Sequence, residues 1–182
     1  MDNLANKNSC LKQRSFLFLI MPSIHLTTII NAPIQVCFDL SRSIDLHMVS
    51  TAETGEHVIA GRTSGLIELN DTVTWRAKHL GVWQNLTSKI TEFNPPNYFV
   101  DEMVSGAFKS FRHEHHFEES NKDTLMKDAF TFESPFGVLG TLANQLFLTK
   151  YMTYFLEERN KVIKDYAESG DAERFLKTGN IQ

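Results

Sequence analysis

Three of the seven histidines in the chain lie within four positions, in the segment SFRHEHHFEES, residues 110–120. Imidazole can transfer protons near neutral pH, bind a metal ion or donate a hydrogen bond, so this segment is the first place to look for chemistry. Successive side chains of a β-strand point to opposite faces. As a strand, the segment has one wholly polar face, and its other face carries Phe111, His113, His115 and Phe117. The alternation predicts a half-buried antiparallel strand with two histidines facing the core.

The next segment, TLMKDAFTFESP, predicts the neighbouring strand, and its more apolar face should also point inward. A hairpin that turns at Asn121-Lys122 brings inward residues opposite one another: Phe117 with Met126, His115 with Asp128, His113 with Phe130, and Phe111 with Phe132. The sequence therefore predicts a His115–Asp128 pair in an apolar interior. A shielded Asp128 must be protonated or hydrogen-bonded, and the imidazole directly opposite is the expected donor.

Three interpretations of the inward histidines are open. They can be core residues whose polar atoms are satisfied by Asp128, backbone or water. They can orient a small molecule in an otherwise apolar pocket. A metal site needs three or four ligands, and a strand pair at i and i+2 supplies two, so we expect no metal and no cofactor. Acid–base chemistry by His115 and Asp128 is a further possibility, although no nucleophile or phosphate-binding motif accompanies them.

Other segments add side chains to the same interior. Trp75 and His79 alternate onto one face of TVTWRAKHL, and His47 lies on a short helix at the expected mouth of a cavity. Leu142 and Leu146 come from the apolar first half of a long C-terminal helix. The candidate ligand-binding residues are therefore His47, Trp75, His79, Phe111, His113, His115, Phe117, Met126, Asp128, Phe130, Phe132, Leu142 and Leu146.

The elements that must position these residues follow one order along the chain: a strand, two short helices, six strands and a long helix. IHLTTIINAP alternates and predicts a strand over 24–31, Pro33 suits the first turn of a helix, and Ser43 is expected to cap the second helix. Six strand segments separated by turn residues follow. Apolar spacing predicts a helix over 136–169 whose first half enters the core, while its charged second half, including EERNK, is solvated.

Length and composition limit the class of protein. The chain has 182 residues, 42% hydrophobic content, a net charge of -4 and a pI near 6.0, which predicts one soluble domain. Lysines and arginines are scattered, so we expect no nucleic-acid partner. Two cysteines are too few for a disulfide framework and favour the cytoplasm.

Both ends of the chain are expected to lie outside the domain, which we place at 23–169. Residues 1–22 contain an apolar run, Phe16–Met21, that is shorter than a signal-peptide core and too short to span a bilayer. We therefore interpret 1–22 as a disordered or non-native extension. Residues 170–182 are interpreted as a polar, frayed tail.

The element order, and the segments AGRTSGLIELNDTVTWRAKHLGV, NPPNYFVDEMVSGAFKSFRHEHHFE and TLMKDAFTFESPFGVLG, resemble the START-like or SRPBCC superfamily. Within it they are similar to a bacterial ligand-binding subgroup sometimes labelled cell-division-inhibitor-like. The resemblance implies an α+β helix-grip fold, in which a strongly bent antiparallel sheet of about seven strands wraps around a long C-terminal helix, with an apolar cavity between them.

Three functions are compatible with that resemblance, because the fold does not choose among them. The first is a carrier or sensor that binds a small hydrophobic molecule, such as a lipid, an isoprenoid or a polyketide-like aromatic compound. The second is a cyclase or dehydratase that uses the His115–Asp128 pair. The third is a protein-interaction role in cell division.

Overall fold

The computed structural model describes residues 22–134 and 137–176, and side chains within 137–146 are not described. The predicted N-terminal extension, apart from Pro22, and the side chains of Leu142 and Leu146 lie outside this description.

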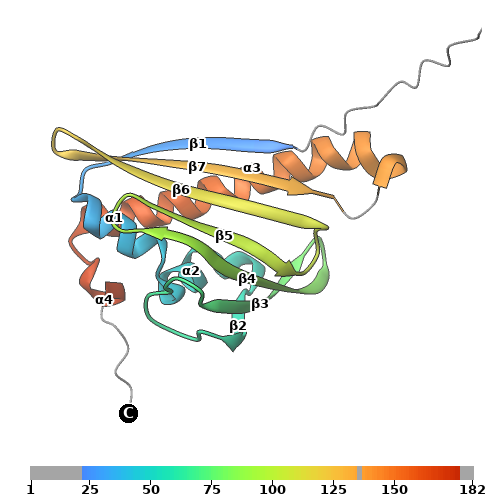
Figure 1. Ribbon diagram of the computed structural model, residues 1–182, viewed down its shortest axis with the longest axis horizontal. Coiled ribbons are helices and arrows are strands. Elements are labelled where there is room, and N and C mark those ends of the chain that lie inside the picture. The colour runs from blue at the N-terminus through green and yellow to red at the C-terminus, as the bar shows by residue number, and fades with distance from the viewer. Residues whose placement is uncertain (1–21, 135–136, 177–182) are drawn as a thin grey trace, which may run out of the picture.

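A seven-stranded antiparallel sheet with the order β1-β7-β6-β5-β4-β3-β2 forms the body of the molecule (Figure 1). The strands are β1 (Ser23–Ile30), β2 (His57–Gly61), β3 (Thr72–His79), β4 (Val82–Asn94), β5 (Tyr98–Ser105), β6 (Ser110–Ser120) and β7 (Asp123–Glu133). The helices are α1 (Ile34–Ser41), α2 (Ile44–Ser50), the 3-10 turn η1 (Ala52–Thr54), α3 (Gly137–Ser169) and α4 (Glu173–Leu176). Figure 1 shows α3 running along the sheet; α1 contacts α3, β6 and β7, and α2 contacts α1 and α3.

The predicted element order is confirmed, and local sequence explains it. Pro33 precedes α1, and the hydroxyl of Ser43 caps α2 by accepting a hydrogen bond from the amide of Leu46 at 3.3 Å. The β6–β7 hairpin turns at Asn121-Lys122 with the predicted register, so that His115 is the Cα partner of Asp128. None of the helices in the described residues has the length and apolar character needed to cross a membrane.

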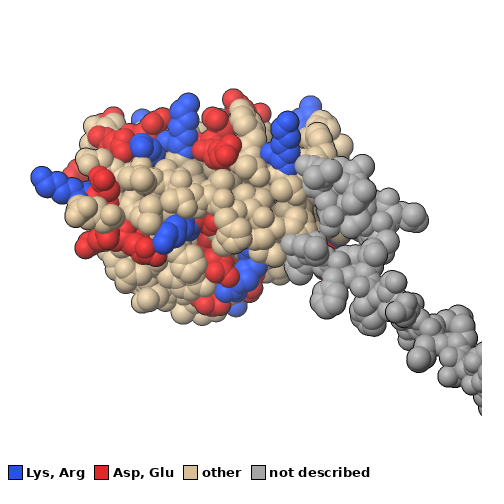
Figure 2. All heavy atoms as spheres, turned by 90° about the horizontal axis from the view of Figure 1, so that it is seen from above, with Lys and Arg blue, Asp and Glu red and all other residues tan. Residues whose placement is uncertain are grey.

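The outer face of the sheet is polar, as the alternation in β6 predicts. There Arg112 forms ion pairs of 2.7–2.9 Å with Glu92, Glu102 and Glu114. On the face seen in Figure 2, basic and acidic side chains are interspersed instead of gathering in a patch of one sign. Arg112 thus joins β4, β5 and β6 across the outer face, away from the interior.

The prediction that the charged half of α3 is solvated is wrong for two of its residues, although Glu157 and Lys161 are exposed. Arg159 and Asn160, both within the EERNK segment, are buried, whereas Phe147 in the first half is 55% exposed. The reason is helical spacing: Leu156, Arg159, Asn160 and Ile163 recur at intervals of three and four and so share the face of α3 that meets the sheet and α1. Two polar residues of this segment therefore belong to the interior.

The prediction of a frayed tail is also wrong for residues 173–176. They form α4, whose Phe175 is buried with its ring centroid 4.9 Å from that of Tyr166 on α3. The backbone carbonyl of Phe175 accepts a hydrogen bond from Ser43 at 3.3 Å. Phe175, together with Ala172 and Leu176, therefore docks the segment after α3 onto the core.

Two hydrophobic clusters fill the interior. One is centred on Phe38 of α1, whose ring lies within 5.6 Å of the rings of Phe93, Phe99 and Phe117. The other contains Phe111, Phe130 and Phe132 from the paired strands β6 and β7. His113 and His115 lie between these clusters along β6, and both are buried.

Gly61 at the end of β2 is expected to be intolerant of a side chain. Its φ is +81°, and an added Cβ would lie 2.2 Å from the backbone oxygen of Thr72 on β3. Gly61→Ala should therefore lower the free energy of unfolding by about 3 kcal/mol or more, because conformational strain and a backbone clash add. Gly81→Ala is the matched control: its φ is +83° with nothing within 4 Å, so about 1–2 kcal/mol is expected. Equal losses in urea melts would contradict the close β2–β3 approach.

Candidate functional site

A cavity of about 270 Å³ lies between the sheet and α3. Its lining is mostly apolar, with contributions from β3, β4, β5, β6 and α3. Seven of the candidate residues line it: His47, Trp75, His79, Phe111, His113, His115 and Phe130. Four others are buried without lining it: Phe117, Met126, Asp128 and Phe132. Whether the lining residues bind a ligand remains a prediction.

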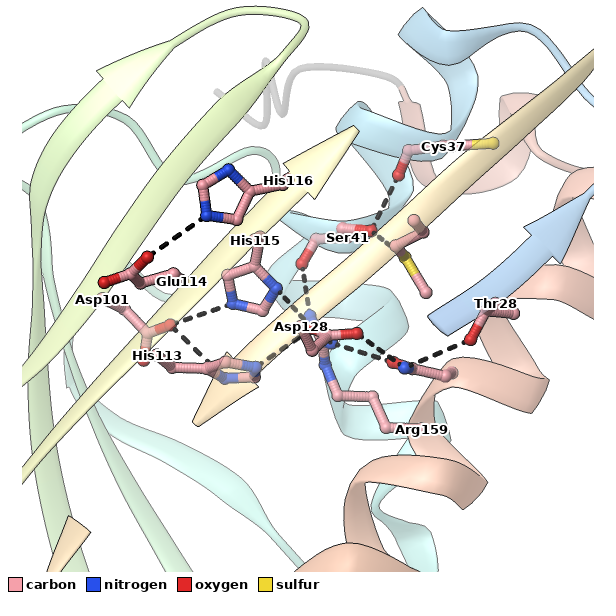
Figure 3. A network of polar contacts seen from close by, with 12 residues as sticks. Thr28, Cys37, Ser41, Asp101, His113, Glu114, His115, His116, Asp128 and Arg159 are labelled. Carbon is pink, nitrogen blue, oxygen red and sulfur yellow. Dashed lines mark hydrogen bonds and ion pairs between the residues drawn. The ribbon is translucent and has the colours of Figure 1, made fainter. Parts of the chain in front are cut away.

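Two buried histidines, the buried Asp128 and the partly exposed Asp101 form a polar group at the sheet side of this cavity (Figure 3). His113 Nε2 is 3.0 Å from Asp128 Oδ1, and His115 Nε2 is 3.1 Å from Asp101 Oδ1. The other nitrogens complete the contacts: His113 Nδ1 is 3.8 Å from Asp101 Oδ1, and His115 Nδ1 is 2.9 Å from Asp128 Oδ1. The two imidazole rings lie between the two carboxylates, with ring centroids 3.8 Å apart.

Sheet register brings these four side chains together. Asp101 on β5 is the Cα partner of His113, and Asp128 on β7 is the Cα partner of His115. The hydrogen bonds nevertheless run diagonally, from each histidine to the carboxylate opposite the other one. His115 Nδ1 approaches Asp128 closely but without hydrogen-bond geometry and has no other partner. The predicted His115–Asp128 pair is thus present as a close contact, but the histidine that makes the hydrogen bond to Asp128 is His113.

Helix α3 completes the network from the other side. The Asn160 side-chain amide donates to Asp128 Oδ2 at 2.7 Å. Arg159 donates to the backbone oxygen of Ser41 at 2.9 Å and lies 3.8 Å from Asp128 Oδ1. The prediction that a shielded Asp128 would be hydrogen-bonded is thus confirmed, with donors from both β6 and α3.

The electrostatics of the group favour charged carboxylates beside a neutral His113. Burial raises the pKa of Asp128, but the hydrogen bond from His113 and the nearby His115 outweigh it and hold that pKa well below its ordinary value. The pKa of Asp101 is likewise lowered: burial acts against this, and the contact with His115 prevails. Burial, together with the neighbouring His115, lowers the pKa of His113 to about 4.

Sequence reasoning missed Asp101, Arg159 and Asn160. Asp101 follows Phe99 by two positions in YFVDEMV, so strict alternation from the buried phenylalanine would have placed it inward. Arg159 and Asn160 were hidden because charged neighbours made the segment look like a solvated helix face. With Asp101 included, Asp101, His113 and His115 present ligand atoms that all lie within 4.8 Å of one another. The count of only two ligands, on which the expectation of no metal rested, is therefore too low.

A second polar group lines the cavity at α2 and β3. His47 Nε2 is 3.3 Å from the buried Glu56, and the His47 ring packs on Trp75 with centroids 4.3 Å apart. Burial raises the pKa of Glu56. The charge and hydrogen bond of His47 lower that pKa by more, so the net shift is downward. His79 Nδ1 is 2.8 Å from the Tyr151 hydroxyl of α3. Strand β3 and helix α3 are thus joined by a polar contact at the cavity wall.

His79 is expected to make the protein less stable in acid. Burial lowers its pKa below the ordinary 6.5, and the charge of Glu56 offsets only part of that shift. Below pH 6.5 the unfolded chain therefore binds a proton that the folded state takes up only at lower pH, and stability falls through this window. In thermal melts at pH 5, 6 and 7, His79→Phe should show a weaker decline than the original protein. Parallel declines would show that His79 does not contribute.

Comparisons with known proteins identify the fold. No protein-family model and no curated protein matches the sequence. Among solved structures, a protein from Thermus thermophilus superposes with a TM-score of 0.66 and 16% identity, covering 80% of this chain and 97% of that one. A START superfamily protein from Mycobacterium smegmatis gives 0.62 and 11%, and ginseng major latex-like protein 151 from Panax ginseng gives 0.60 and 16%, each covering 81% of this chain and 97% of theirs. The chain therefore has the helix-grip fold of the START-like superfamily, as the sequence resemblance implied.

Proposed function

We propose that the protein binds a small, mainly apolar molecule in the cavity between the sheet and α3, as a carrier or sensor. The observation that carries this proposal is the lining itself. Apolar and aromatic side chains enclose about 270 Å³, and a few polar groups converge at one wall. Ligand sites are typically concave, largely apolar and provided with a few placed polar groups; this cavity is slightly smaller than the roughly 300–1,000 Å³ of sites for drug-sized molecules, which favours a small ligand.

The polar wall constrains the ligand. Asp101, His115 and Arg159 all line the cavity, so they offer both an acceptor and donors to one polar end of a bound molecule. The phenylalanines of β6 and β7 would contact its apolar remainder. A lipid, an isoprenoid or a polyketide-like aromatic compound with a hydroxyl, carbonyl or carboxyl group has this chemistry.

The low number of cysteines supports a cytoplasmic location.

The experiment is to purify the protein from its host and record native mass spectra, followed by solvent extraction. We expect an apolar compound bound at one molecule per chain, and competition between that extract and an environment-sensitive apolar dye. Protein that carries no apolar compound and binds no such dye would refute the proposal.

A second candidate is a cyclase or dehydratase, and one contact favours it. His115 Nε2 lies 3.1 Å from Asp101, and both residues face the cavity, so Asp101 replaces Asp128 as the partner in the acid–base pair. If this function is correct, a hydroxyacyl or polyketide substrate is converted by the original protein, and His115→Gln abolishes conversion while the substrate still binds. If the substrate is bound and returned unchanged, the enzyme function is excluded and the carrier function is retained.

A further inference from the structure

We propose that Asp101, His113 and His115 bind one divalent first-row transition-metal ion, such as Zn²⁺ or Fe²⁺, at the wall of the cavity. Asp128 is the carboxylate that orients both histidines for this ion. The site goes beyond small-molecule binding and does not depend on it.

The ligand atoms are already close to the spacing that a metal requires. Two ligands held about 2.1 Å from one ion at 90–110° lie about 3.0–3.4 Å apart. Asp101 Oδ1 is 3.1 Å from His115 Nε2 and 3.8 Å from His113 Nδ1, and all three ligand atoms lie within 4.8 Å of one another, so small side-chain shifts would bring them onto one ion. Two histidines and one carboxylate on one side of an ion are a donor set that Fe²⁺ and Zn²⁺ both accept.

The second nitrogen of each histidine meets the same carboxylate. His113 Nε2 is 3.0 Å and His115 Nδ1 is 2.9 Å from Asp128 Oδ1 (Figure 3). Histidines that bind metals usually donate their remaining N–H to a carboxylate, which fixes the tautomer and the ring orientation. Asp128 is held in turn by the amide of Asn160 at 2.7 Å. Asp128 therefore orients the two histidines, and Asn160 orients Asp128.

An ion would also settle the contact of a buried polar atom that has no hydrogen bond. His115 Nδ1 is buried without a hydrogen bond although Asp128 is 2.9 Å away. When Nε2 carries the proton and donates to Asp101, Nδ1 turns a lone pair toward a carboxylate. A metal on Nε2 moves the proton to Nδ1, which can then be donated to Asp128.

Charge and access agree with a cation at this position. The buried Asp128 and the partly exposed Asp101 lie near one buried guanidinium, that of Arg159, so the group carries one net negative charge when both imidazoles are neutral. Asp101, His113 and His115 line the cavity, whereas Asp128 lies behind them. A coordination position therefore remains open toward the cavity, where water or a ligand can bind.

The test is to treat the full chain with a chelator, remove the chelator, and titrate with Co²⁺ or Zn²⁺ alone. We expect one ion per chain, visible Co²⁺ absorption of a site with nitrogen and oxygen ligands, and a higher melting temperature. His115→Gln, His113→Gln and Asp101→Asn should each weaken binding by about 100-fold or more, and Asp128→Asn by about 10–100-fold. His116→Gln is the control, because His116 lies on the same strand with its side chain on the opposite face, 42% exposed and paired with Glu114.

Three results would overturn the proposal: no stoichiometric binding to the original protein, unchanged affinity in His115→Gln and Asp101→Asn, or an equal loss in His116→Gln. If a variant does not fold, the proposal can still be tested on the original protein by NMR. Long-range ¹H–¹⁵N spectra of the zinc-loaded protein should show metal at Nδ1 of His113 and Nε2 of His115. Unchanged histidine signals on adding Zn²⁺ would likewise overturn it.

Discussion

Asp128→Leu is expected to lower the free energy of unfolding by about 3–5 kcal/mol. The leucine would remove the acceptor for two buried donors, His113 Nε2 and the Asn160 amide. It would also leave the buried Arg159 with one fewer carboxylate nearby. Each stranded donor costs about 1–3 kcal/mol. Asp128→Asn should cost less, because its amide oxygen still accepts one of the two hydrogen bonds.

A double-mutant cycle measures which histidine carries the interaction. We expect Asp128→Leu and His113→Phe to be non-additive by about 1–2 kcal/mol in urea melts, because the second change removes a donor that the first one strands. The same cycle with His115→Phe should show weaker coupling, since His115 donates to Asp101 instead. Strict additivity with His113 would contradict the diagonal hydrogen bond.

Ala77→Phe is expected to weaken binding of an apolar dye by about 100-fold or more. Ala77 is buried on β3 and lines the cavity, so the added ring would occupy the space of the ligand. A ligand that loses contact over roughly 100 Å² of apolar surface loses about 2.5 kcal/mol, which corresponds to nearly two decades in affinity.

The matched control adds similar bulk outside the cavity. Val104 on β5 is 60% exposed and does not line the cavity, so Val104→Phe should leave dye affinity unchanged. Fluorescence titration of both variants, with melting temperatures recorded in parallel, separates loss of the site from loss of the fold. Equal affinity in Ala77→Phe and Val104→Phe would place the dye elsewhere.

The strands and their pairing could be predicted because their signals are local. Alternation from Phe111 to Phe117, and a turn at Asn121-Lys122, were sufficient for the β6–β7 register and hence for the position of Asp128 opposite His115. The direction of the hydrogen bonds could not be obtained in this way. It depends on the side-chain rotamers of His113 and His115 and on a third strand, β5, whose register to β6 is independent of the hairpin.

The burial of polar residues on α3 could not be predicted from the sequence, for a different reason. Hydropathy averages over a segment, so two buried polar residues among charged neighbours carry no apolar signal of their own. Arg159 and Asn160 are stabilised inside because acceptors such as Asp128, Thr28 and the Ser41 carbonyl meet them there. These partners are distant in sequence, and only the packed fold brings them together.

The order of the strands leaves the sheet open, and both of its edges are protected against pairing with other molecules. At β1, Lys164 of α3 donates to the backbone oxygen of Ile29, and Glu168 accepts from the backbone amide of Asn31, each at 2.8 Å. At β2, the edge strand has five residues and an irregular register between Val58 and Ala60. Short, bulged or covered edges disfavour the addition of further strands, so this architecture resists edge-to-edge aggregation without closing into a barrel.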